Sequence, residues 1–140
     1  GAPNGAERDS ARDMSRYLLQ AACSGLVERV YWWRLAAHGF GLVDERADPW
    51  RPRPAYHAWL RLLEVAGAAT FVGNLPMSGG AVLHQFERPD GERFAIGYAW
   101  EKDAPGFQIA CGHAESMHGA RLDAVPHALG PDPVYFRQLA

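Results

Sequence analysis

Apolar residues recur at intervals of three and four over residues 6–23 and again over residues 54–66. This spacing places the apolar side chains of each segment on one face and is typical of an amphipathic helix. Pro54 suits the first turn of the second helix, and Gly67 suits the position just after its end. The pattern therefore predicts two helices in the first half of the chain.

Between these helices, residues 28–35 are rich in β-branched and aromatic side chains. Such a run is typical of a strand covered on both faces, and we expect one over residues 29–35. Because side chains alternate along a strand, Trp32 and Trp33 should point to opposite faces. The first half of the chain is thus predicted to be helix, strand, long loop and helix.

The second half has short runs of strand-forming residues separated by Gly and Pro. Asp90-Gly91 is a hairpin signal, because glycine tolerates a positive φ. The close spacing of the runs favours antiparallel pairing. We therefore expect an α+β fold, with a helix-strand-helix unit over residues 1–66 and an antiparallel, sandwich-like sheet over residues 67–140. The expected strands are 70–72, 81–87, 93–100, 106–111, 120–125 and 134–138.

Five motifs follow one another in an order found in a known family. An Ala-rich helix ends in Ser-Gly, and it is followed by Val-Glu-Arg-Val-Tyr-Trp-Trp, Phe-Gly-Leu-Val-Asp, Pro-Ala-Tyr-His-Ala-Trp and finally Pro-Val-Tyr-Phe, at residues 17–25, 27–33, 40–44, 54–59 and 133–136. This order resembles the C-terminal part of clan A glycoside hydrolases, (β/α)8 barrels with an appended β-sandwich. The resemblance implies the seventh helix, eighth strand and eighth helix of such a barrel, and then the sandwich. The segment 116–119 departs from the family's turn pattern.

The resemblance also implies an activity, cleavage of a glycosidic bond in a polysaccharide or oligosaccharide by two carboxylates. It places both carboxylates upstream of Gly1, so it implies no catalytic residue within this sequence. The implied partners are a carbohydrate and the remainder of the barrel. The sequence alone would then supply structural support and a wall of the sugar pocket, without a cofactor.

Four residues are candidates for contact with the sugar, because barrel sites lie at the C-terminal ends of strands. Trp32 and Trp33 offer flat indole faces, and we prefer Trp32 because the family has an aromatic residue at that step. Arg34 suits a carboxylate, such as that of an acidic sugar. His38 follows in the loop. The alternatives are core aromatic residues, a surface arginine and a surface histidine.

Composition limits the other classes of function. The 140 residues carry a net charge of −2, which argues against a nucleic-acid or anionic-membrane partner recognised through bulk charge. No apolar run reaches the length of a membrane span. Cys23 and Cys111 are expected to be separate thiols. A chain of this length is too short for a complete barrel.

His113, Glu115 and His118 are the one cluster with metal-ligating chemistry, but a solvated turn is the favoured interpretation, so no metal is expected. Asp44 and Glu45 are neighbours in a loop and do not suit an acid/base pair. Two other functions stay open. One is a stand-alone module that binds a carbohydrate or small apolar ligand between Trp32, Trp33, Trp59 and Trp100, and the other is a purely structural or interaction domain.

Overall fold

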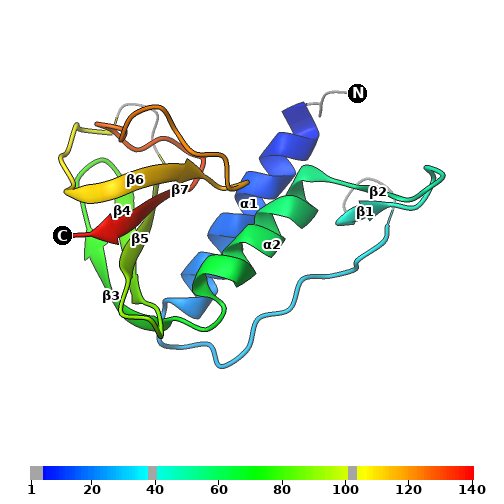
Figure 1. The fold of residues 1–140 in the computed structure, drawn as a ribbon. Coiled ribbons are helices and arrows are strands. Elements are labelled where there is room, and N and C mark those ends of the chain that lie inside the picture. Colours follow the sequence, from blue (N-terminus) through cyan, green and yellow to red (C-terminus); the bar gives the residue numbers. More distant parts are fainter. Residues whose placement is uncertain (1–4, 38–40, 101–103) are drawn as a thin grey trace.

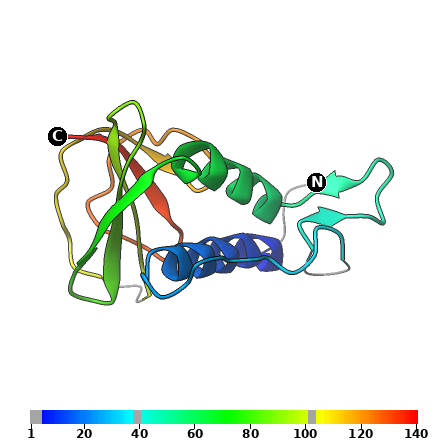
Figure 2. The same ribbon diagram turned by 90° about the horizontal axis from the view of Figure 1, so that it is seen from below.

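Two helices form one layer of the protein in the computed structural model, which describes residues 5–37, 41–100 and 104–140. They are α1 (Gly5–Ala22) and α2 (Pro54–Ala66). The helices lie side by side and run in the same direction, while the chain between them returns in the opposite direction (Figure 1, Figure 2). Both helices agree closely with the predicted ranges.

A five-stranded sheet forms the other layer. Its strands are β3 (Thr70–Pro76), β4 (Ala81–Glu87), β5 (Arg93–Ala99), β6 (Cys111–Ser116) and β7 (Val134–Leu139). The strand order is β3-β4-β5-β7-β6, and every neighbouring pair is antiparallel. The fold is therefore α+β, as predicted.

Alternation along β5 explains how the sheet joins the two halves of the chain. Phe94, Ile96 and Tyr98 are fully buried against the helices, whereas Ala95 and Ala99 belong to a second apolar cluster on the opposite face. That second cluster is completed by the long connections before and after β6. One apolar core thus includes side chains from both helices and from the sheet.

The predicted strand at residues 29–35 is wrong. This segment is extended, but it is not one of the strands of the described residues. Within the described residues, one backbone–backbone hydrogen bond involves it, and Val43 N donates it to Leu35 O. A strand needs a neighbouring edge with which to pair. In Figure 1 the chain runs below the helices, away from the five-stranded sheet and toward the β1–β2 ribbon, so the segment does not follow an edge of the sheet.

Two further predictions in the second half are wrong. Residues 106–110 form an irregular connection, and residues 120–125 contribute only an isolated bridge between Arg121 and Glu115. A short ribbon of β1 (Val43–Asp44) and β2 (Arg51–Pro52) lies in the loop before α2. The hairpin between β4 and β5 is confirmed, with Gly91 at φ +89°.

Candidate functional site

Side-chain burial alternates over residues 30–33 of the extended segment 28–35. Val30 and Trp32 are partly buried against the core shared by the helices and the sheet. Tyr31 and Trp33 point away from that core and are 74% and 70% exposed. The exposed face continues to Leu35. The segment is therefore extended, with one face covered by the core and the other face exposed.

Trp32 lies on the covered face. Its ring meets Tyr17 edge to face at a centroid separation of 6.1 Å. The indole Nε1 is buried and has no hydrogen-bond partner among the described residues. Trp32 thus serves the core, and little of its face is open to a ligand.

Trp33 and Arg34 lie together on the open side. The Arg34 guanidinium carbon is 5.3 Å from the centroid of the Trp33 ring, a cation–π distance. Arg34 has φ +68°, which turns the chain at the end of the segment. Of the two tryptophans, Trp33 is the one whose face is open to a sugar. The family resemblance favours Trp32 for this contact. His38 lies outside the described residues.

A group of ion pairs fixes the loop that follows this segment. Arg51 contacts Glu7 of α1 at 2.6 Å, and Arg46 donates two hydrogen bonds to Asp44 at 2.9 and 3.0 Å. Arg53 is buried and donates to a backbone carbonyl of the loop. The hydrogen bonds from Arg46 hold the pKa of Asp44 well below its ordinary value. Asp44 is therefore an ionised anchor for the loop and a poor proton donor.

The other two candidate tryptophans do not gather around these residues. Trp59 lines a shallow apolar groove between α1 and α2, and the lining of that groove includes none of Trp32, Trp33 and Trp100. Trp100 is half exposed, with the guanidinium of Arg16 4.1 Å from its ring centroid. The four tryptophans therefore do not form one pocket.

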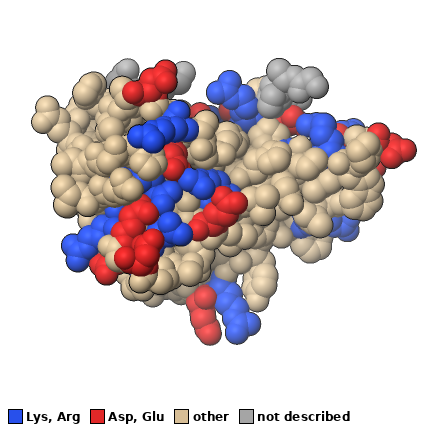
Figure 3. Space-filling model, viewed as in Figure 1, with Lys and Arg blue, Asp and Glu red and all other residues tan. Residues whose placement is uncertain are grey.

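A second polar cluster, here called the α2–β6 ion network, joins the helix layer to the edge of the sheet. It consists of Arg61, Glu92, His113, Glu115 and Arg137. Glu115 accepts hydrogen bonds from Arg61 at 2.5 and 3.1 Å, from His113 at 2.9 Å and from Arg137 at 3.3 Å. Arg137 also makes a bidentate pair with Glu92 at 2.6 and 2.7 Å. Figure 3 shows basic and acidic side chains intermingled on this face.

The hydrogen bonds of the α2–β6 ion network keep Glu115 ionised. Burial of Glu115 raises its pKa, but the donors Arg61 and His113 outweigh this effect, and its pKa is lowered. Every side-chain oxygen of Glu115 already has a partner, so the carboxylate is not poised to react with a substrate. His118 is not hydrogen-bonded to Glu115 in the described structure, and no metal-binding group of three suitable side chains is present among the described residues. The network joins α2 to the sheet edge formed by β6 and β7.

Two buried features could not be predicted from the sequence, because their partners are far apart in the chain. One is the pairing of Arg61 and Arg137 with Glu115. The other links His84 to Asn74 at 2.6 Å and to Tyr98 at 2.9 Å. The sequence signal for the second feature is His84, a polar residue within an apolar strand. The two cysteines are free thiols, as predicted.

Comparison with known proteins adds no relative. The chain matches no protein-family model, no curated protein and no solved structure. Within the described parts of the chain, no helix has the length and apolarity needed to cross a membrane. The function must therefore be argued from the arrangement of the residues themselves.

Proposed function

We propose that this chain is the C-terminal portion of a (β/α)8 glycoside hydrolase. It would supply the last helix-strand-helix unit of the barrel and a β-domain that packs against it. Its role is structural support and contact with a polysaccharide or oligosaccharide. The catalytic carboxylates lie elsewhere in the enzyme.

The observation that carries this proposal is the unpaired segment 28–35. An extended segment with helices packed on one face and an open opposite face is what the strand of an α-β-α unit of a barrel would be without its neighbouring strands. The parallel direction of α1 and α2 and the reversed direction of the segment fit the same unit (Figure 1). Side chains in the interior of the barrel would cover Tyr31, a large apolar side chain left exposed here.

Trp33 and Arg34 are the residues best placed to contact the sugar. They follow one another at the C-terminal end of the segment, where barrel enzymes hold their substrates. The indole face suits the apolar face of a sugar ring, and the guanidinium suits a carboxylate or hydroxyl group. The other wall of this pocket would come from the rest of the barrel.

Self-association of the isolated chain tests the proposal. Exposed apolar side chains favour association, so sedimentation velocity should detect dimers or larger species. The double variant Tyr31→Ser, Trp33→Ser should shift the population to monomer. Trp50→Ser is the matched control, because Trp50 is 60% exposed but lies outside the segment. A wild-type chain that stays monomeric at high concentration would contradict the proposal.

The alternative is a stand-alone carbohydrate-binding module, and titration with oligosaccharides separates it from the barrel proposal. With half of its pocket missing, the isolated chain should show no saturable change in tryptophan fluorescence. A saturable change that Trp33→Ala abolishes would instead favour the module. Hydrolysis of a glycoside by the isolated chain, lost in Glu115→Gln, would contradict both proposals.

A further inference from the structure

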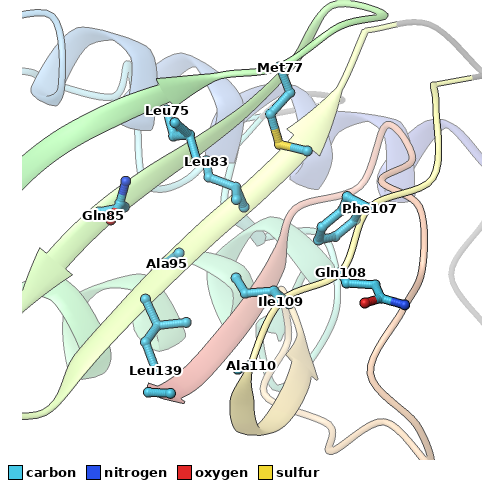
Figure 4. Close-up of a pocket in the computed structure, with 11 residues that line it drawn as sticks. Leu75, Met77, Leu83, Gln85, Ala95, Phe107, Gln108, Ile109, Ala110 and Leu139 are labelled. Carbon is cyan, nitrogen blue, oxygen red and sulfur yellow. The ribbon is translucent and has the colours of Figure 1, made fainter.

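A cavity of about 330 Å³ opens on the face of the sheet that the helices do not cover. It lies between β3, β4 and the irregular connection of residues 107–110. Figure 4 shows Met77, Leu83, Phe107 and Ile109 around a common space. Leu83 is buried, whereas Leu75 is half exposed, so the cavity runs from the sheet surface out to solvent.

The sheet is tightly covered right beside this cavity. An added Cβ at Gly97 would lie 2.5 Å from Leu83 Cδ2 and 3.1 Å from Leu129 Cδ2. Protein interiors normally leave few voids larger than a water molecule. The open space beyond Leu83 therefore contrasts with the close packing on the other side of the same leucine.

The connection that forms the outer wall is held in place at two points. Phe107 N donates to His127 O at 2.7 Å, and Ala140 N donates to Ala110 O at 3.0 Å. These hydrogen bonds tie the connection to the outer loop and to the end of β7. The outer wall is thus fixed at both of its ends.

The lining of the cavity determines which molecules fit. No side chain in it carries a charge, and most are aliphatic or aromatic. Gln85 is the partly buried polar residue of the wall, and no hydrogen bond to its carboxamide is present among the described residues. Pockets for small molecules typically pair an apolar lining with a few polar groups, and this volume is near the lower end of their range of roughly 300–1,000 Å³.

From this lining we propose a second binding site, on the β-domain, for a small uncharged ligand that has one flat apolar ring and one hydroxyl group. The ring occupies the space between Leu83, Ala95 and Ile109, on the Gln85 side of the cavity (Figure 4). The hydroxyl exchanges a hydrogen bond with the Gln85 carboxamide. This site lies on the far face of the sheet from the helices and is independent of the proposed sugar pocket.

Methyl-detected NMR titration of the full chain with p-cresol tests the site, with p-xylene as a ligand of similar shape that lacks the hydroxyl. We expect saturable shifts at the methyl groups of Met77, Leu83 and Ile109. p-Cresol should bind more tightly than p-xylene, and Gln85→Leu should weaken p-cresol about fivefold while leaving p-xylene unchanged.

A blocking variant separates binding in the cavity from binding elsewhere. Ala110 is exposed in the outer wall, so Ala110→Trp should abolish the shifts without disturbing the core. Ala128→Trp is the matched control, since Ala128 is exposed and outside the lining. Absence of saturable shifts, shifts confined to Leu18 and Leu62 of the other groove, or unchanged binding in Ala110→Trp would overturn the proposal.

Discussion

Glu115→Ala is expected to lower the free energy of unfolding by about 3 kcal/mol. Glu115 is 5% exposed and accepts hydrogen bonds from Arg61, His113 and Arg137. Its removal leaves Arg137, itself only 8% exposed, without one of its two carboxylate partners. Desolvated charges that lose a partner are costly, so the effect should be much larger than that of a surface pair. Urea unfolding followed by circular dichroism measures it.

Glu64→Ala provides the matched control for this prediction. Glu64 also pairs with Arg61, at 3.1 Å, but its side chain is 64% exposed. Exposed pairs contribute about 0–1 kcal/mol, so Glu64→Ala should have little effect. Equal losses in the two variants would mean that the α2–β6 ion network does not hold the helix layer to the sheet.

The stability of the protein should fall by about 2 kcal/mol between pH 7 and pH 5 because of His84. Burial lowers the pKa of His84 from 6.5 to about 4. Between these values the unfolded chain binds a proton that the folded chain does not, so acidification favours unfolding. The stabilisation that depends on neutral, buried His84 is fully present above pH 6.5 and is lost as the pH falls toward 4.

His84→Gln should remove most of this pH dependence. A glutamine amide can donate to Asn74 and accept from Tyr98, and it does not titrate in this range. His118 also has a lowered pKa, chiefly through burial. The quantity to compare is therefore the change in stability with pH in the wild-type protein and in His84→Gln. Urea midpoints at pH 7, 6 and 5 supply it. Parallel pH profiles would show that His84 is not buried in its neutral form.

Local patterns predicted the helices well. Residues 54–66 carry their own start signal, their own apolar stripe and their own stop signal, and the helix has those bounds. The hairpin between β4 and β5 is equally local, since two adjacent runs and an Asp-Gly turn define it. Structure that depends on neighbours within a few residues can be predicted from the sequence.

Pairing partners could not be predicted in the same way. Residues 29–35 have the composition and alternation of a strand, but a strand also requires an edge supplied by another part of a protein. Residues 120–125 have the apolar pattern of a strand for a related reason. Leu122 and Val125 belong to an irregular connection that covers the sheet. Periodicity reports which side chains are buried and leaves the hydrogen-bond partners unspecified.

In the candidate site, too, some features follow from the local sequence and others depend on tertiary packing. Alternation correctly separated Trp32 from Trp33, but which of them faces the helices depends on the packing of α1 and α2. The α2–β6 ion network brings residue 61 beside residue 115, a contact that no spacing rule anticipates. The sequence therefore predicted that Trp32 and Trp33 face opposite sides, but not which of them faces the helices.

Unfolding of Trp32→Ala and Trp33→Ala tests the central claim most directly, namely that residues 28–35 are an extended segment covered on one face only. Trp32 packs on the core, so its variant should lose about 2 kcal/mol of stability. Trp33 is 70% exposed, so its variant should change stability by less than about 0.5 kcal/mol. Equal losses, or a larger loss for Trp33→Ala, would contradict the account.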